Sequence, residues 1–393
     1  MPITAEDLNA LRQGQPPRDP LFLKEMTLGE NIWLDWFSEH YLENFILKGG
    51  SKVKVLTGSE GSGKTHMLRW IQNRAQELGY IAIFLNLSLD ETKLSDIINL
   101  YKSIATKIDQ EKIIQSLCQK VGYELGYPED RYNGSVPILP LMVEDGFSTQ
   151  NAQREIRITA QRLIHQYDLS LSFATFAYNI ISDRMIEHND NRTQIYWNWF
   201  CGEKLLPAER KMTRLYDRLI GPTARTWIYS LTRLINICGM KGLVLLVDGL
   251  ETITERLPDT NRYFYTPNQA KDTCELIRQM IDDIELQRNQ IIILSGRPQM
   301  IDDERRGFES YDALKMRLQS GLVSSDTFNK YADIVDIDQH LQESGISEHI
   351  DDHLQQLFKN EGFKRGIRVF PPIETQSSLR RKIVETANLT MEV

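Results

Sequence analysis

The stretch VKVLTGSEGSGKTHMLRW, residues 53–70, reads as a short apolar strand, a turn rich in small residues, and the start of a helix. Its centre fits the pattern G-x-x-x-x-G-K-[ST]. In this pattern the glycines let backbone N–H groups turn inward around phosphate oxygens, and the helix that follows offers them its positive N-terminal end. The order strand, loop, helix therefore predicts an ATP-binding P-loop. The residues expected to contact the nucleotide are Gly58, Ser59, Glu60, Gly61, Ser62, Gly63, Lys64, Thr65 and His66.

Two side chains at the end of this loop have separate expected roles. Lys64 would reach the β- and γ-phosphates, and the Thr65 hydroxyl would bind Mg²⁺. Asp248 ends the apolar run GLVLLVD at residues 242–248. An acid that ends such a strand can hold the magnesium ion of a P-loop ATPase (the Walker B position). The sequence therefore predicts a Mg²⁺ site shared by Thr65 and Asp248.

Hydrolysis needs further groups. Many P-loop ATPases place a glutamate directly after the Walker B acid, but this chain has Gly249 there. Glu251, two residues further on, would either orient the attacking water or cap the next turn, and the pattern supports both interpretations equally. Ser295 ends the apolar run IIILSG at residues 291–296. It is a candidate sensor residue for the γ-phosphate, with an ordinary strand end as the alternative.

Arginines further along the chain are candidates for transition-state contacts. Arg297, Arg305 and Arg306 follow the strand at 291–296. An arginine at a subunit edge can stabilise charge on a neighbour's γ-phosphate, which would imply a homo-oligomer. A plain surface position is the alternative for each of them. Arg380 or Arg381, on the last helix, would contact the nucleotide from a lid.

The alternation of strands and helices predicts an α/β fold with a parallel sheet and right-handed crossovers. Residues 92–240 read as helical and are too long for an ordinary crossover, so they are expected to be a helical insertion. Residues 1–24 are expected to be a loose arm. The expected strands are 53–56, 80–88, 242–248, 291–296 and 332–337, and the main expected helices are 32–46, 65–78, 268–286 and 311–319, with short helices in 343–388.

Composition limits the class of protein. The chain has 393 residues with 41% hydrophobic and 25% charged residues, which is enough for about two or three packed units. A net charge of −8 argues against a wholly basic nucleic-acid binder but allows local basic faces, such as residues 204–233 and 361–382. No apolar run reaches the ~20 residues of a membrane span. With no apolar signal segment and four scattered cysteines, a cytoplasmic protein with reduced thiols is expected.

Two further groups of residues have simpler interpretations than a binding site. His349 and His353 are four residues apart, but no acid follows His349 and no third ligand is evident, so a solvated helix is favoured over zinc. The loop RYFYT, residues 262–266, would stack on bases or pack beneath its own loop, and packing is favoured.

Three stretches together resemble the P-loop ATPases of bacteriophage-exclusion (BREX) systems, in particular the stand-alone BrxD type. They are residues 54–80, 231–253 and 296–318, and the part at 302–318 is the most specific. The resemblance extends over about residues 28–318. It implies an AAA/ASCE-like core with a C-terminal helical lid, working beside a helicase or methyltransferase partner in anti-phage defence. Its carried-over sites are Lys64, Thr65 and Asp248, while Gly249 departs from the family's usual Asp-Glu pair.

The expected units are therefore an N-terminal arm and helix (1–50), the first part of the core (51–91), the insertion (92–240), the second part of the core (241–338) and the lid (339–393). Three functions remain open. The first is a motor or switch ATPase of a defence complex on DNA. The second is an ATP-loaded, slowly hydrolysing adaptor of the transposition-regulator type that recruits an effector, and Gly249 favours it. The third is a signalling NTPase whose insertion binds a protein trigger.

Overall fold

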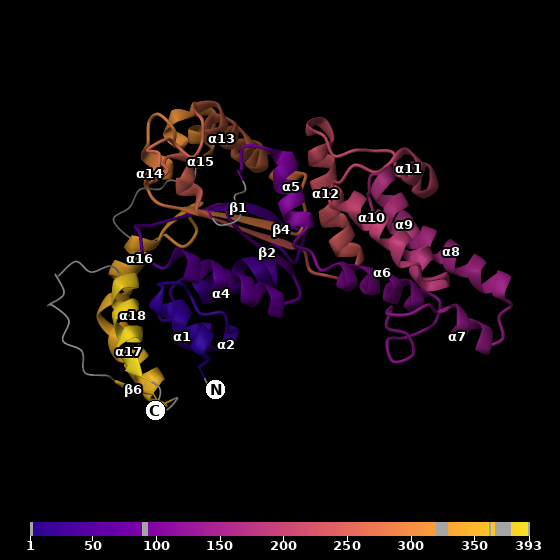
Figure 1. Ribbon diagram of the computed structural model, residues 1–393, viewed down its shortest axis with the longest axis horizontal. Helices are drawn as coiled ribbons and strands as arrows, with labels where there is room; N and C mark the ends of the chain where they lie inside the picture. Colours follow the sequence, from indigo (N-terminus) through magenta and orange to yellow (C-terminus); the bar gives the residue numbers. More distant parts are fainter. Residues whose placement is uncertain (1–2, 89–92, 320–328, 361–362, 366–378, 392–393) are drawn as a thin grey trace.

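The computed structural model describes residues 3–88, 93–319, 329–360, 363–365 and 379–391. At its centre lies a five-stranded, all-parallel sheet in the order β2-β3-β4-β1-β5 (Figure 1). The predicted α/β fold with a parallel sheet is confirmed, and it is consistent with a P-loop fold. The strands are β1 Ser51–Thr57, β2 Ile81–Asn86, β3 Leu243–Asp248, β4 Gln290–Gly296 and β5 Ile334–Asp336.

Helices cover both faces of the sheet, because alternate residues of a strand point to opposite faces. Val244 and Leu246 of β3 face a core made with α4, whereas Leu243 and Leu245 belong to the core on the other face. The first face is covered by α3 Leu34–Phe37, the π-helical turn η1 Ser38–Phe45 and α4 Lys64–Glu77. The second is covered by α5 Ile97–Ala105, α12 Gly221–Ile237 and α13 Pro267–Asp282.

The N-terminal residues are not a loose arm, so that prediction is wrong. They form α1 Ala5–Arg12 and α2 Pro20–Met26, and Thr4 and Asp19 cap the two helices with their side chains. Leu8, Leu11, Phe22 and Met26 are buried against Ile350, Leu354 and Phe358 of a helix near the opposite end of the sequence. The segment at 32–46, expected to be one α-helix, is the short α3 continued by η1.

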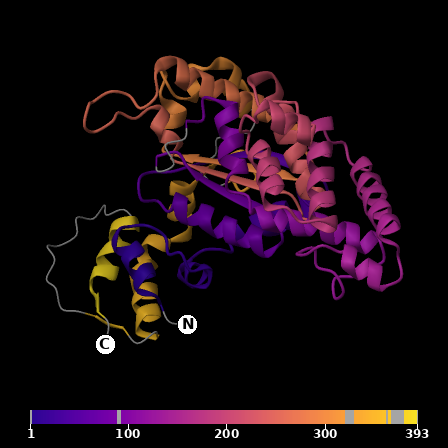
Figure 2. The same cartoon turned by 45° about the vertical axis from the view of Figure 1, so that its right-hand side comes forward.

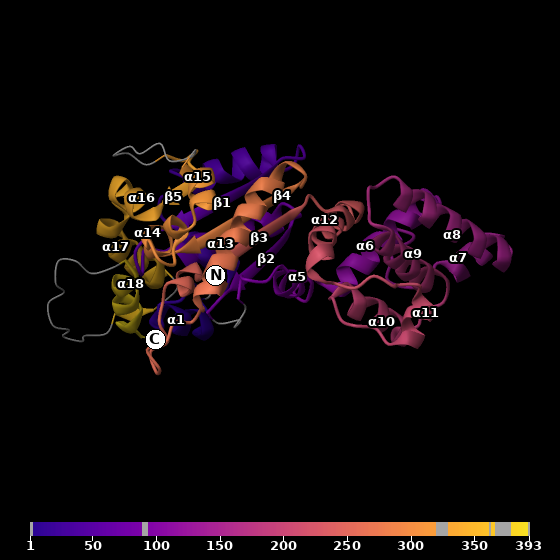
Figure 3. The ribbon, with the colours of Figure 1, turned by 90° about the horizontal axis from the view of Figure 1, so that it is seen from above.

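The segment between β2 and β3 is helical, as expected, and extends from one end of the sheet, while the C-terminal helices lie at the opposite end (Figure 3). Its interior is aromatic, with Phe173, Phe176, Trp199 and Phe200 almost fully buried. Between α5 and α12 its helices are α6 Gln110–Glu124, α7 Leu139–Glu144, α8 Thr149–His165, α9 Leu171–Ile186, α10 Asp190–Phe200 and α11 Pro207–Thr213.

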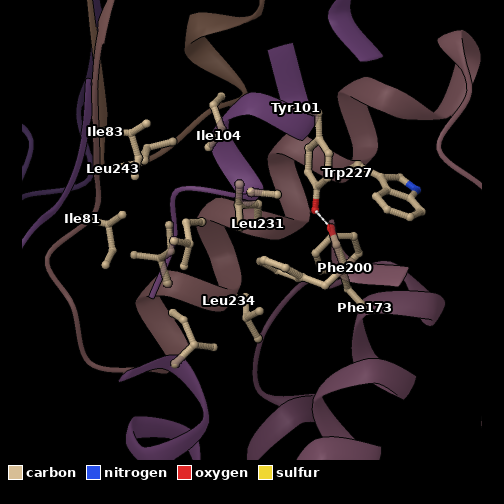
Figure 4. Close-up of a cluster of buried hydrophobic side chains, with 14 of the residues drawn as sticks. Ile81, Ile83, Tyr101, Ile104, Phe173, Phe200, Trp227, Leu231, Leu234 and Leu243 are labelled. Carbon is tan, nitrogen blue, oxygen red and sulfur yellow. Dashed lines mark hydrogen bonds between the residues drawn. The ribbon is translucent and has the colours of Figure 1, made fainter. Parts of the chain in front are cut away.

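One hydrophobic core joins this helical segment to the sheet. Trp227 of α12 packs on the rings of Tyr101 and Phe173, and the Tyr101 hydroxyl donates a 2.9 Å hydrogen bond to the Phe200 carbonyl (Figure 4). The same cluster continues to Ile81 of β2. The α5–α12 junction therefore connects the aromatic interior with the face of the sheet.

After β3 the chain forms the short elements that lead to β4 and β5. They are η2 Leu250–Ile253, η3 Asp283–Glu285, α14 Gln299–Asp302, η4 Phe308–Ser310 and α15 Asp312–Gln319. The helices expected at 268–286 and 311–319 are thus present with shorter bounds, the first of them as α13 followed by η3.

The C-terminal part contains the expected short helices, α16 Ile337–Ser344, α17 Ile346–Asn360 and α18 Leu379–Asn388. A small antiparallel pair, β6 Lys364–Arg365 with β7 Thr390–Met391, was not predicted. α1 lies beside α17 and α18, so the two ends of the chain meet (Figure 2). Most of the basic stretch at 361–382 lies outside the described residues. None of the described helices combines the length and apolarity that a membrane crossing requires.

Candidate nucleotide site

The predicted P-loop connects the end of β1 to the start of α4. Gly61 and Gly63 have φ angles of +77° and +98°, a conformation that other residues rarely adopt. A side chain at Gly58 would bring its Cβ to 2.7 Å from the Ser62 hydroxyl oxygen. The loop therefore requires glycine at three positions of the motif, two for their positive φ angles and one for lack of space for a side chain.

Lys64 lies inside this loop and is 8% exposed. Its Nζ donates 2.7 Å hydrogen bonds to the carbonyl oxygens of Gly58 and Ser59. Burial lowers the pKa of Lys64, while the nearby carboxylates of Glu251 and Asp248 act in the opposite direction. The ammonium group thus closes the loop across its opening.

Thr65 and Asp248, 183 positions apart in the sequence, are in direct contact. The Thr65 hydroxyl donates a 2.7 Å hydrogen bond to Asp248 Oδ2, and the Gly249 N–H donates to Asp248 Oδ1 at 3.0 Å. Both residues lie at the carboxyl edge of the sheet, where parallel α/β sheets bind their ligands. A hydroxyl and a carboxylate are hard oxygen donors of the kind that Mg²⁺ prefers.

Gly249 turns the chain so that Glu251 lies at the same site. Gly249 has a φ of +81° and begins η2, which brings Glu251 back over the end of β4. A Cβ built on Gly296 would lie 3.0 Å from Glu251 Oε2. This oxygen is buried and has no hydrogen-bond partner among the described residues. Burial raises the pKa of Glu251, and the neighbouring Asp248 adds to the shift.

This geometry bears on the two interpretations of Glu251. The Glu251 side chain lines a cavity, with Oε2 unpartnered among the described residues, and the carboxylate also has a hydrogen bond to its own backbone N–H. A glutamate at position 249 itself would need a left-handed backbone, which is strained for any residue with a side chain. An acid two positions later is therefore the arrangement that suits this turn.

Ser295 and Arg297 differ in position. Ser295 is fully buried in β4, its hydroxyl has no partner in the described structure, and it is not among the residues that line the cavity. Arg297 does line the cavity, where its guanidinium lies 3.2 Å from Glu60 and 3.0 Å from Glu255. A third carboxylate, that of Glu251, lies 3.9 Å from Arg297 Nε. Arg297 thus faces the site of its own chain.

Arg305 and Arg306 lie away from the cavity. Arg306 donates a 2.8 Å hydrogen bond to the Tyr265 carbonyl, and its guanidinium lies 3.5 Å from the centre of the Tyr263 ring. The Arg305 backbone N–H donates to Asp303, and its side chain is exposed. In the RYFYT loop, Tyr265 is fully buried while Tyr263 is 37% exposed. The structure therefore joins Arg306 to this loop and not to the P-loop.

Of the two candidate lid arginines, Arg380 reaches the P-loop. Its backbone N–H donates to the Gly61 carbonyl at 3.1 Å, and Nη1 lies 3.7 Å from Glu60 Oε1. Nη2 donates to the Gln13 carbonyl at 3.2 Å, which adds a contact with the N-terminal region. Arg381, in contrast, forms a 2.9 Å ion pair with Glu385 on its own helix.

His66 is fixed by the N-terminal region. The Thr27 hydroxyl donates to the Leu23 carbonyl at 2.7 Å, so it accepts the proton of His66 Nε2 at 2.8 Å. Burial lowers the pKa of His66 to about 4. The imidazole is therefore neutral at physiological pH. The two histidines of α17 are elsewhere, and His353 contacts the Glu25 carbonyl of α2 at 2.7 Å.

These residues surround one cavity of about 310 Å³. Its polar lining contains the P-loop, Asp248, Glu251 and Arg297, and its apolar lining comes from both ends of the chain. Such a mixed lining suits a ligand that has a charged tail and an aromatic base. The apolar residues include Met26, Leu28, Leu34, Ile346, Ile350, Leu379 and Ile383.

Several polar residues at the site were not foreseen from the sequence. Asn86 ends β2 opposite Asp248, and its Oδ1 accepts a 2.6 Å hydrogen bond from the Ser88 hydroxyl. Both line the cavity. Asp338 of α16 accepts hydrogen bonds from the N–H and hydroxyl of Ser59 at 2.7 and 2.8 Å. A polar residue at the end of β2 was the available signal for Asn86, whereas nothing local marks Asp338.

The comparisons with known proteins give a family for the chain. Residues 4–365 match the family model described as BREX system ATP-binding protein BrxC/D. Neither the search of curated proteins nor that of solved structures returns a match. The family match covers nearly the whole chain, including the N-terminal helices and the helices between β2 and β3.

Proposed function

The chain belongs to the BREX system ATP-binding protein BrxC/D family, and from this premise we propose that it hydrolyses ATP. In this proposal it acts as a motor or switch of a bacterial anti-phage defence complex on DNA. The observation that supports hydrolysis most directly is the contact of Thr65 with Asp248 beside the buried Glu251 carboxylate. Binding requires only the P-loop, whereas turnover requires these acids in addition.

Each polar residue of the cavity named below has a part in the proposed reaction. The P-loop amides and Lys64 bind the phosphates, and Thr65 and Asp248 hold Mg²⁺. The bound metal supplies charge neutralisation on the phosphate oxygens. Glu251 accepts a proton from the attacking water, a task for which a raised pKa is suited. Ser295 is buried in β4 and does not line the cavity, so in this proposal it acts on the γ-phosphate end only indirectly.

The arginines complete the proposed machinery. Arg297 contacts the phosphates bound to its own chain, and Arg380 contacts the nucleotide from α18. Both guanidinium groups lie near the carboxylate of Glu60 in the P-loop, which supports these roles. Arg305 or Arg306 acts in trans within a homo-oligomer, since neither faces the cavity of its own chain. We further propose that the units follow the predicted boundaries and that the protein acts in the cytoplasm with a helicase or methyltransferase partner.

One alternative keeps ATP binding and removes turnover. In this case the chain is an ATP-loaded adaptor of the transposition-regulator type that recruits an effector. Gly249 favours it, because no acid directly follows Asp248. The three glutamates around Arg297 also favour it, since they hold this arginine away from a simple phosphate contact.

Steady-state ATP turnover with and without duplex DNA distinguishes the two functions. The motor or switch requires hydrolysis that DNA stimulates and that Lys64→Ala removes. Lys52→Ala is the matched control, because Lys52 lies on β1 just before the loop and pairs with Asp333 at 2.7 Å. Tight ATP binding without turnover, with or without DNA, would favour the adaptor. Absence of ATP binding in folded protein would reject both.

A further inference from the structure

The helical segment carries a stretch of chain whose exposed side chains are both basic and apolar. We define residues 204–220 as the docking segment. It contains α11 and the extended chain that follows. The docking segment contains five lysines and arginines and two acids. This stretch plays no part in the nucleotide site described above.

The exposed cations of the docking segment have no partner among the described residues, whereas its two acids accept hydrogen bonds. Lys204, Lys211, Arg214 and Arg218 are exposed, and none has a side-chain ion pair or hydrogen bond to a residue that the structure describes. Glu209 accepts a 2.6 Å hydrogen bond from the Leu206 N–H, and Asp217 accepts one of 2.6 Å from the Ser172 hydroxyl. The net field of this surface is therefore positive, although the whole chain is acidic.

Large apolar side chains are exposed among these cations. Leu206, Met212, Tyr216 and Ile220 are 64%, 52%, 60% and 48% exposed. Leu171, beside Ser172 at the start of α9, is 83% exposed. Single exposed apolar residues are ordinary, but a group of this size on one stretch marks a binding surface.

The docking segment is held firmly by the core beneath it. Thr213 and Leu215 are buried, the Asn179 amide donates to the Thr213 carbonyl at 2.7 Å, and the Trp199 indole donates to the Asp217 carbonyl at 2.9 Å. Its exposed side chains are thus presented from fixed backbone positions. A preformed surface loses less entropy on binding than a disordered one.

We propose that the docking segment binds an acidic protein segment that carries apolar side chains. Unpaired cations complement a negative partner and increase its association rate. The aliphatic and aromatic side chains between them need an apolar surface to cover them, which the phosphate backbone of duplex DNA does not offer. The surface therefore fits a protein partner better than a nucleic acid. This inference names the chemistry of the defence-system partner proposed above and does not require ATP hydrolysis.

The test measures binding of the full chain to defined probes, without nucleotide, by fluorescence anisotropy. The first probe is a labelled synthetic peptide with Leu at helical spacing and Glu at the other positions. The second has Lys in place of each Glu. Duplex DNA and phosphatidylglycerol vesicles are the third and fourth. Lys211→Glu combined with Arg218→Glu reverses the charge at two positions, and Met212→Ser combined with Tyr216→Ser removes apolar contacts.

The matched control is Arg154→Glu with Arg157→Glu on the exposed face of α8, which makes the same change of charge elsewhere on the same helical segment. We expect the acidic peptide alone to bind, and each docking variant to weaken it by about tenfold while the control retains it. No binding of the acidic peptide, equal loss in the control, or preferred binding of DNA or vesicles would overturn the proposal. Because the assay contains no nucleotide, its outcome is separate from that of the ATPase assay.

Discussion

The nucleotide cavity and the docking segment differ in whether their positively charged side chains are paired. Around the cavity, Lys64, Arg297 and Arg380 are all held by oxygen atoms of the P-loop or of nearby acids. On the docking segment, exposed cations such as Lys211 and Arg218 have no partner in the described structure. The cations that line the cavity are paired with nearby oxygen atoms, so a small anionic ligand must displace those oxygens in order to bind. The exposed cations of the docking segment have no such competitor within the described part of the chain and suit a large partner. The two proposed binding regions of one chain would thus suit different classes of ligand.

The largest expected effect concerns the core of the helical segment. Phe173 is fully buried and packs on the rings of Phe176, Trp199, Phe200 and Trp227. Phe173→Ala should lower the free energy of unfolding by about 3–5 kcal/mol, because it removes a large ring and leaves a cavity. Urea denaturation measures this loss, and an ATP titration below the transition should show unchanged affinity.

The control for this comparison is Tyr123→Ala, since Tyr123 is 70% exposed and should change stability by only about 0.5 kcal/mol. An equal fall in ATP affinity and in stability for Phe173→Ala would show that the two regions are not separable. In that case the nucleotide cavity and the helical segment differ in surface chemistry but do not fold independently.

The second prediction concerns Glu251. Glu251→Gln should reduce ATP turnover by about 10²–10⁴-fold, because the proton acceptor is lost, and should leave ATP binding nearly unchanged. Glu255→Gln is the matched control, since Glu255 also pairs with Arg297 but is not among the cavity-lining residues. Equal turnover in wild type and Glu251→Gln would exclude Glu251 as the base and support the adaptor.

The same substitution should also change stability with pH. The folded protein raises the pKa of Glu251, so the ionised carboxylate is disfavoured in the folded state. Stability from this group is complete below the unfolded pKa and is lost as the pH rises through the folded pKa. Glu251→Gln should therefore stabilise the fold at neutral pH but not in acid, which urea midpoints at the two pH values would reveal.

The site was predictable from sequence where the signal is local. The glycines of the P-loop and the apolar strand that ends in Asp248 are short patterns, and parallel strands bring their carboxyl ends to one edge. The contact of Thr65 with Asp248 follows from that rule. Gly249 stands where an acid is usual, and its left-handed turn positions Glu251, whose role as the base stays a prediction.

The parts that sequence reasoning missed depend on distant contacts. The N-terminal helices are short and proline-bearing, and their burial comes from Ile350, Leu354 and Phe358 more than 300 positions away. Asp338 reaches Ser59 only because β5 lies next to β1. The sequence also does not show which way Arg297 points. An arginine that faces a neighbouring subunit and one that faces the site of its own chain have the same sequence pattern.

A smaller effect is expected for the lid arginine. Arg380→Ala should weaken ATP binding by about 3- to 10-fold, because a half-exposed charge contributes only about 1 kcal/mol. Arg381→Ala is the adjacent control and should bind ATP normally, since Arg381 pairs with Glu385 instead. Isothermal titration with Mg-ATP measures both. Equal affinities for the two variants would remove α18 from the nucleotide site.

The last prediction concerns His66 in acid. Its pKa falls from 6.5 to about 4 in the folded protein, so the folded state disfavours the protonated ring. The stability from the neutral ring is complete above pH 6.5 and is lost as the pH falls toward about 4. His66→Gln should flatten the dependence of the urea midpoint on pH in this range. The exposed His349→Gln should keep the wild-type slope, and a steep slope in His66→Gln would assign the acid sensitivity elsewhere.

The unbroken apolar packing from Phe173 through Trp227 to Ile81 has a mechanical consequence. A flexible hinge would need a break in that packing, and none exists at the α5–α12 junction among the described residues. The outer helices therefore behave as a lever arm fixed to the strands. A load applied at Tyr216 would then be transmitted to β2, the strand that ends with Asn86 at the candidate nucleotide cavity.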